Sequence, residues 1–504
     1  MGWIGNMAEK IRSGLRSWLS ITPAQQTTFS IRESLSFEAN IIKNRIWYIG
    51  DADELSQLYS QLWDGQNKNR FWAAVSTSGR EIRKIHTGLP AIIVDMLTNI
   101  IMTNMDDIKV PDKRKDDWKN IRTENNFKDL LDTAVSECLY LGDGAFKISF
   151  DDAISKSPII EWYPADEIEV VTKRGRLKEV VFYTVYVHER REYVLHETYG
   201  FGYVKYELRR RDSDRKVELS TVPELADLTD IGFHDAVCLA VPFRIFKHPR
   251  KKGRGKSIYD GKTDDFDAVD EAWSQWMQAL RDGRSTKYIP DRLLPRNPNT
   301  GEVLRSNPFD NSYIVTDSNG LEDIPEKIEV MQPVIPHDSY CATYVTALDL
   351  ALQGIISPST IGNDEKKLDN AESQREKEKT TLYTRGKIID ALQDTIPLVI
   401  NTAFKFLDIL HNVAVEETEV ALDFGEYANP SFESQVETIG SAKTKGIVSN
   451  EALVDELYGD TKPEEWKKEE VKRLNIRDGL EEMEEPALNM DGLEIEEEGG
   501  RVKT

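Results

Sequence analysis

The 504-residue sequence has few cysteines, no long apolar run and less positive than negative charge. Its three cysteines, Cys138, Cys238 and Cys341, are odd in number and far apart, which excludes a disulfide framework and a CxxC metal site. We expect all three to be buried free thiols of a reducing cytoplasm. No segment reaches the roughly 18 apolar residues of a membrane span. The net charge of −23 argues against a general role in coating nucleic acid or membranes, so any contact with DNA is expected to be local.

Catalytic signatures are also missing. The sequence contains no HExxH, no GxSxG and no paired zinc motif, so we expect no catalytic residue, no metal and no cofactor. The segment GRGKS resembles the end of a phosphate-binding loop, but that loop needs glycine at the position of Arg250, and GKT at Gly261 has Lys256 in the same place. A nucleotide-driven enzyme is therefore the weaker alternative.

The sequence of residues 1–29 predicts an amphipathic arm, with apolar residues on one side of a helical pattern and basic residues on the other. We expect the arm to dock on a partner or a neighbouring subunit. The alternative is that it lies on a membrane surface, without stable insertion. No secretory cleavage site is present, and Asn6 stands where the myristoylation pattern requires Ser or Thr.

Apolar spacing divides the first half of the chain. Residues 30 to about 145 have helical spacing, whereas residues 145 to about 245 alternate with period two and are rich in β-branched and aromatic side chains. Together these residues predict an α+β body within a mostly helical chain.

A basic segment follows the last strand of this body. It contains six positive charges within ten residues, and they are either those of a solvated loop or an anchor for nucleic acid or an acidic neighbour. The residues are Lys247, Arg250, Lys251, Lys252, Arg254 and Lys256.

The middle of the chain predicts a helical stalk. A helix over 263–282, capped by Thr263 or Asp264, carries an apolar stripe and, opposite it, a negative side. A second helix over 338–356 has start signals at Asp338 and Ser339. The proline-rich insertion between them, 284–336, has strand candidates at 301–306 and 311–317 and is expected at the tip of the stalk. The negative side consists of Asp264, Asp267, Asp270 and Glu271.

The turn SPSTIGNDEKKLDN leads from the second helix into a very long third helix, from Ala371 to about His411. Its polar beginning cannot face a core, and its apolar end is expected to be buried. Pro397 lacks an amide and predicts a kink. A strand over 419–424 and three short helices between 431 and 476 follow. The tail from Gly479 has nine acidic residues before Gly499 and is expected to be disordered.

The chain resembles the portal protein of tailed bacteriophages, in the siphophage-type family of head-to-tail connectors. The resemblance is carried by VPFRIFKH, by SPSTIGNDEKKLDNAESQREKEKTTLYTRGKIIDAL, by KGIVSNEALVDELYG and by the acidic tail. It covers about residues 30 to 480. It implies the portal fold: a wing at 30–262, stem helices at 263–283 and 337–356, a clip at 284–336, a tunnel loop at 357–371, a long kinked helix at 372–412, a wing strand at 413–430, a crown at 431–478 and an acidic tail at 479–504.

The resemblance further implies a ring of twelve subunits through which double-stranded DNA enters and leaves the capsid. The ring is expected in the virion, and the protein in the host cytoplasm during assembly. Its expected partners are other copies of the chain, the terminase large subunit, the major capsid protein and scaffold, and the head-tail adaptor. Lys366, Lys367 and Asn363 of the tunnel loop are candidates for contact with DNA, and the four carboxylates at 264–271 for a repelling channel wall. The alternative for the tunnel-loop residues is an ordinary solvated turn, and the alternative for the carboxylates is a helix surface that faces outward. The alternatives for the function of the whole chain are another structural assembly protein or a membrane-associated scaffold.

Overall fold

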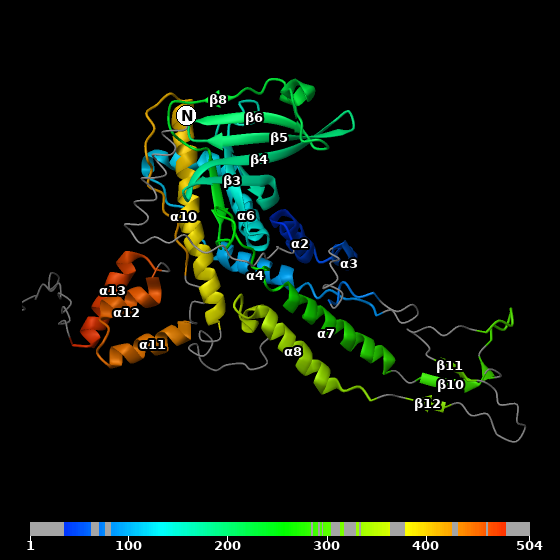
Figure 1. The fold of residues 1–504 in the computed structure, drawn as a ribbon. Coiled ribbons are helices and arrows are strands. Elements are labelled where there is room, and N and C mark those ends of the chain that lie inside the picture. Colours follow the sequence, from blue (N-terminus) through cyan, green and yellow to red (C-terminus); the bar gives the residue numbers. More distant parts are fainter. Residues whose placement is uncertain are drawn as a thin grey trace, which may run out of the picture.

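The computed structural model combines helices and sheets, as predicted, in a body, a stalk that leaves it and a group of three helices near the C-terminal end (Figure 1). It describes residues 35–61, 70–75, 82–283, 286–290, 293–294, 296–303, 313–316, 329–331, 334–362, 378–425, 432–459 and 462–479. The N-terminal arm, the tunnel-loop residues Asn363, Lys366 and Lys367, and the tail beyond Gly479 lie outside these ranges.

Helices form the first layer of the body. Ser36 caps α2 by accepting a hydrogen bond from the amide of Ala39, and Gly50 ends that helix with a φ of 74°, in the left-handed region that favours glycine. The apolar face of α4 is buried in the common core. The helices are α2 (Phe37–Ile49), α3 (Ala52–Gln61), α4 (Leu89–Thr103), α5 (Lys115–Glu124) and α6 (Phe127–Leu141), with a short η2 (Asp112–Arg114) before α5.

Two sheets complete the body. The small sheet has the order β2-β1-β9 and is antiparallel, and Phe146 at its centre packs against Trp162 and Phe243. The large sheet has the order β3-β4-β5-β6-β7, with β8 also paired to β6. The strands are β1 (Asp143–Ser149), β2 (Ile159–Pro164), β3 (Ile168–Lys173), β4 (Arg176–His188), β5 (Arg191–Gly200), β6 (Tyr203–Arg210), β7 (Lys216–Val217), β8 (Ile231–Gly232) and β9 (Ala240–Arg244), with single turns η3 (Ala165–Glu167), η4 (Leu219–Thr221) and η5 (Pro223–Leu225).

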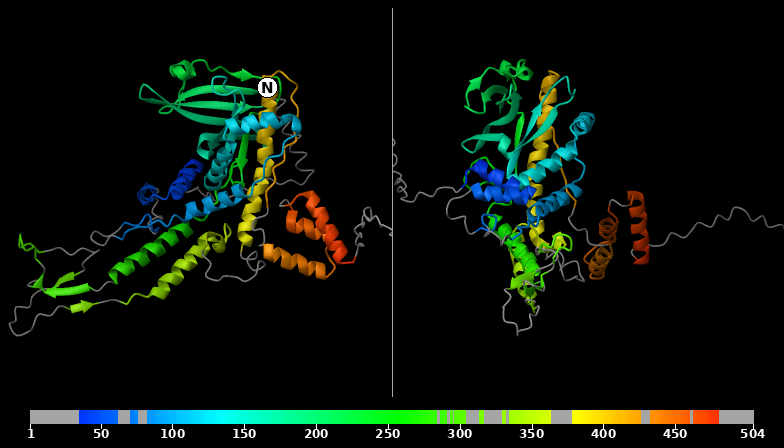
Figure 2. Two further views of the ribbon diagram at one scale, coloured as in Figure 1. Left: turned by 180° about the vertical axis from the view of Figure 1, so that it is seen from behind. Right: turned by 90° about the vertical axis from the view of Figure 1, so that its right-hand side faces the viewer.

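The stalk consists of two helices, α7 (Thr263–Asp282) and α8 (His337–Leu352), which lie side by side and carry a three-stranded sheet at their far end (Figures 1 and 2). In this sheet β10 (Thr286–Pro290) pairs in parallel with β11 (Tyr313–Thr316) and antiparallel with β12 (Glu329–Met331). The strand predicted at 311–317 is therefore confirmed. Of the one predicted at 301–306, the described part makes only an isolated bridge, between Val303 and Arg296.

Three details of the stalk prediction are wrong. The N-caps are Lys262 and Pro336, without side-chain capping, because the polar residues expected as caps already lie within the first turns. The second helix ends at Leu352, four residues early, since Gly354 turns the chain with a φ of 80° ahead of the Ser357–Pro358 step. Cys341, on α8, is only partly buried, whereas Cys138 and Cys238 are buried as expected.

A single turn, η7 (Pro358–Ile361), follows the stalk, and the described part of the long helix, α10, runs from Lys379 to Leu410. Its inner face is buried in the body, as predicted for the apolar end. Pro397 lies inside this continuous helix, and the kink there stays a prediction.

The strand predicted at 419–424 is wrong. Only two isolated bridges form, Lys109 with Ala421 and Met105 with Phe424. The pairing slips by one residue between these two bridges, which breaks the ladder as a bulge does. The three predicted C-terminal helices are present as α11 (Phe432–Thr444), α12 (Asn450–Tyr458) and α13 (Glu464–Arg477). None of the described helices is long and apolar enough to cross a membrane.

Candidate functional site

The carboxylates of α7 do not form one exposed wall. Asp267 and Asp270 are only 7% and 1% exposed, whereas Asp264 is exposed and Glu271 half-buried. Asp264 forms an ion pair with Arg70 at 2.7 Å. The prediction that Asp267 and Asp270 line a channel is therefore wrong, because both lie inside the subunit; for Asp264 and Glu271 it stays a prediction.

Asp267 holds the chain that precedes α4. Its carboxylate accepts hydrogen bonds from the backbone amides of Phe71, at 2.9 Å, and Trp72, at 3.3 Å. Burial raises the pKa of the Asp267 carboxyl, while the two amides oppose the rise by favouring the charged form. The side chain thus serves as an acceptor for a segment 195 residues earlier in the sequence.

Asp270, one turn further along α7, is bonded still more completely. Its carboxylate lies 2.7 Å from Nδ1 of His86 and accepts from the Thr87 amide and hydroxyl at 2.9 and 2.8 Å. The Trp72 indole donates to it at 3.2 Å. Ser274, on the next turn, accepts from the amide of Ile85 at 2.9 Å.

We call Asp267, Asp270 and Ser274 the α7 clamp. Their spacing of three and four residues places them on one helix face, and that face meets the segments 70–75 and 82–88. The clamp fixes the base of the stalk to the helical layer of the body.

Aromatic side chains join the two stalk helices further out. The ring of Tyr344 on α8 lies 5.5 Å from Trp273 and 6.4 Å from Trp276 on α7, between ring centres. Trp276 also meets His337 edge to face. Such contacts contribute roughly 0.5–1.5 kcal/mol each beyond burial, so they favour a stalk that moves as one unit.

The basic segment is not uniformly solvated. Arg254 binds both oxygens of Asp143, at 2.8 and 2.9 Å, and donates to the backbone carbonyls of Ile168 and Ala165. Its guanidinium also covers the ring of Phe37 at 4.5 Å. Arg254 is therefore a structural residue that joins the two sheets, and its inclusion in a free basic patch is wrong.

Gly255 and Ser257 of the GRGKS segment have packing roles as well. A Cβ atom on Gly255 would lie 2.0 Å from the carbonyl oxygen of Gly142, and the Ser257 hydroxyl donates to the carbonyl of Tyr140 at 2.7 Å. These residues close the loop against the end of α6. A phosphate-binding loop needs such groups free to face a nucleotide.

The remaining cations lie at the surface. Lys247, Arg250, Lys251 and Lys252 are exposed, and Lys256 is half-buried. Three of them, Arg250, Lys251 and Lys256, line a cleft of about 340 Å³ with the start of α2 and a further cation, Lys43. Lys43 comes from a segment predicted only as helical, and no motif in the sequence pointed to it.

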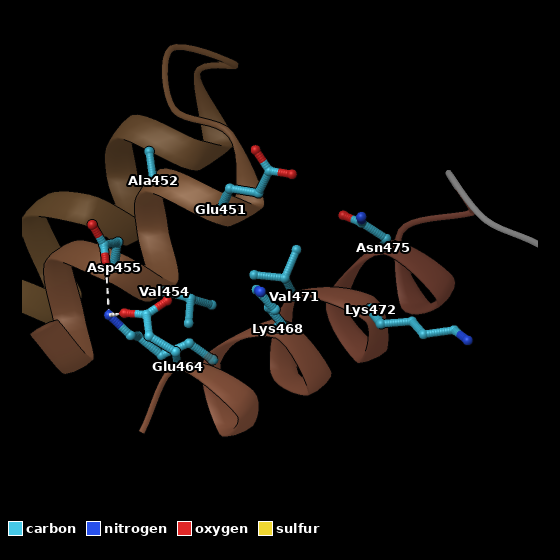
Figure 3. A pocket seen from close by; sticks show the side chains of 10 residues that line it. Glu451, Ala452, Val454, Asp455, Glu464, Lys468, Val471, Lys472 and Asn475 are labelled. Atoms are coloured by element: carbon cyan, nitrogen blue, oxygen red, sulfur yellow. Dashed lines mark hydrogen bonds and ion pairs between the residues drawn. The ribbon is translucent and has the colours of Figure 1, made fainter. Parts of the chain in front are cut away.

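A groove of about 880 Å³ lies between α12 and α13, and Figure 3 shows its lining. Lys467 bonds to Asp455, at 2.9 Å, and to Glu464. Apolar contact is limited to a few side chains such as Val454 and Val471. This mixed and open surface is unlike the apolar pockets that hold small molecules. Within the described ranges no group of three or more His, Cys, Asp or Glu residues is placed to hold a metal ion.

No known family profile matches the sequence, and no curated protein does. Solved structures give distant similarities. One is a chain from the neck of a native GTA particle computed with C12 symmetry, at 13% identity and a TM-score of 0.37, covering 74% of this chain and 91% of that one. Another is from the virion of a native gene transfer agent particle, at 12% identity and a TM-score of 0.35, covering 86% of this chain and 94% of that one. A third, from the neck of an empty GTA particle computed with C6 symmetry, has 13% identity and a TM-score of 0.35 and covers 73% of this chain and 89% of that one. At these values the likeness establishes neither a family nor a function for this chain.

Proposed function

We propose that this chain is a portal protein of a phage-like particle. In this role twelve copies form a ring at one capsid vertex, and double-stranded DNA passes through its centre during packaging and ejection. The protein is then a structural component of the virion rather than an enzyme. Its partners are the terminase motor, the major capsid protein and scaffold, and the head-tail adaptor.

The observation that carries the proposal is the stalk together with the long helix after it. Two antiparallel helices carry a small sheet away from the body, and a helix of 32 described residues follows them in the sequence. A stem, a clip and a long helix in this order are what the sequence resemblance implies, and this agreement supports the proposal. A sheet held at a distance buries little against its own body, so it is suited to contact neighbouring subunits or partners.

The charge of the chain fits the proposed channel. A net charge of −23 per subunit makes any ring of such chains strongly negative. A wall of that sign repels the phosphate backbone, so DNA can slide without adhering. Asp264 and Glu271 remain the stem candidates for that wall.

Negative-stain electron microscopy of the purified full chain tests the ring. We expect circular particles with a central hole, and native mass spectrometry should give a multiple of the 57.6-kDa subunit. A compact monomer under every assembly condition would refute the proposal.

The tunnel-loop lysines need a separate test. We expect the double variant Lys366→Ala, Lys367→Ala to assemble into rings but to change the packaging rate or the length of retained DNA, because transient phosphate contacts are lost. A matched control, Lys178→Ala with Lys216→Ala, removes two exposed lysines of the large sheet and should leave packaging unchanged. Unaltered packaging by the loop variant would contradict a role of these lysines in DNA movement.

A further inference from the structure

The cleft beside the start of α2 brings together groups from three parts of the chain. One wall is the first turn of α2, another is the loop at 248–251, and Lys43, Lys256, Asp260 and Gly261 complete the lining. The positive end of a 13-residue helix dipole therefore faces the same space as several ammonium groups. Helix starts combined with cations are typical anion sites.

Lys43 is the residue that distinguishes this cleft from an ordinary basic surface. It is only 8% exposed, and among the described residues no hydrogen bond or ion pair reaches its ammonium group. Burial lowers the pKa of Lys43, and the negative charge of Asp260 acts in the opposite direction. Burying a lysine ammonium without a direct partner lowers the stability of the fold unless a ligand supplies a compensating negative charge.

Asp260 does not fill that role alone. Its carboxylate already accepts hydrogen bonds from the side chains of Asn40, at 2.8 Å, and Asn44, at 3.3 Å, and from the amide of Ser257, at 3.2 Å. Two other carboxylates act on this region. Glu38 interacts with Lys251, and its pKa is lowered, first by a backbone hydrogen bond and also by that lysine. Asp264 acts on Lys43 but forms an ion pair with Arg70. The positive groups therefore outnumber the negative ones around the cleft.

The loop side is held in a fixed shape. Nδ1 of His248 accepts the backbone amides of Arg250, at 3.1 Å, and Lys251, at 2.8 Å. The His248 ring therefore fixes the backbone of two residues that line the cleft. The loop is thus ordered before any ligand arrives, which reduces the entropy that binding would cost.

We propose that this cleft binds a phosphate group, with Lys43 at its base and Lys251 and Lys256 at its rim. Phosphate presents several oxygens in different directions, which suits donors that converge from a helix end, a buried lysine and a loop. The site is a property of one subunit and holds whether or not the chain forms a ring.

Isothermal titration of the full chain with inorganic phosphate, at constant ionic strength, tests the site. We expect saturable binding that Lys43→Gln weakens at least about ten-fold, the loss of one charge-assisted contact. Because Lys43 is buried, Lys251→Gln serves as a second variant at the exposed rim and should weaken binding several-fold. Lys252→Gln, an exposed lysine of the same loop outside the cleft, is the matched control. No binding by the parent chain, or equal losses in all three variants, would overturn the proposal.

A duplex of about 20 base pairs distinguishes the two sources of the phosphate. If the ligand is the DNA backbone, inorganic phosphate should compete with the duplex, and Lys43→Gln should reduce the salt dependence of DNA binding by about one unit of slope. If the ligand is a free phosphate, adding the duplex should leave the titration with inorganic phosphate unchanged, and Lys43→Gln should not alter DNA binding. Either result upholds the site, and a chain that binds neither ligand refutes it.

Discussion

The α7 clamp makes a strong prediction about Asp270. Asp270→Ala removes the acceptor of the buried Trp72 indole and of the partly buried Thr87 amide and hydroxyl and leaves these donors unpaired. Losing a buried, multiply bonded carboxylate costs about 3–5 kcal/mol. We expect the segment at 82–88 to detach locally from the stalk before the body unfolds.

Hydrogen exchange read by mass spectrometry measures this detachment. The amide of Ile85 is the best reporter, because Ser274 rather than Asp270 accepts its hydrogen bond. A cost of about 3 kcal/mol corresponds to faster exchange by a factor of about 100 or more.

The matched control is Asp264→Ala, six residues earlier on α7, which breaks an ion pair with Arg70 whose carboxylate is largely exposed. It should cost less than about 1 kcal/mol and leave the exchange of Ile85 unchanged. If Asp270→Ala leaves Ile85 as protected as in the parent, or if both variants expose it equally, the clamp does not hold the segment.

Two further predictions concern stability. Burial raises the pKa of Tyr59 from 10.0 to about 12, so the stability contributed by its neutral phenol is present below pH 10 and is lost as the pH rises to 12. Two pKa units equal about 2.7 kcal/mol. In urea unfolding, the free energy of unfolding of Tyr59→Phe should therefore fall by about that much less than the parent's between pH 9 and pH 12. Equal falls would contradict the assignment. Gly255→Ala should cost about 1–3 kcal/mol because its Cβ would overlap the Gly142 carbonyl, whereas Gly386→Ala, inside α10 with no atom within 4 Å of the new Cβ, should gain about 0.5–1 kcal/mol in the same assay. A stable Gly255→Ala would refute the close approach.

Apolar spacing predicted most of the elements of the fold. The stripe that includes Phe266 and Val269 gave the bounds of α7 correctly, since both residues are fully buried. Alternation also predicted β3 to β6 of the large sheet, but not the two-residue strands β7 and β8. It failed at 419–424, because a strand needs a partner in register and the chain near Lys109 supplies only two bridges.

The site was harder to predict from sequence. A helix pattern separates the apolar side of α7 from its polar side, but it cannot say that part of the polar side meets a segment some 200 residues earlier. For this reason Asp267 and Asp270 were assigned to a channel wall although they are buried. Arg254 was grouped with its basic neighbours, and only the fold shows that Asp143 neutralises it. Lys43 gave no signal, since its importance arises from burial alone.

The clamp at the base of α7 has a mechanical consequence. A helix of 20 residues is about 30 Å long, and it is fixed to the body near its first turns. The far end of α7 lies about 18 Å beyond Asp270, so a rotation of about 10° at that residue would carry it through about 3 Å, and the sheet beyond it further still. The stalk therefore acts as a lever, because a small rotation at Asp267 and Asp270 becomes a larger displacement of the distal sheet.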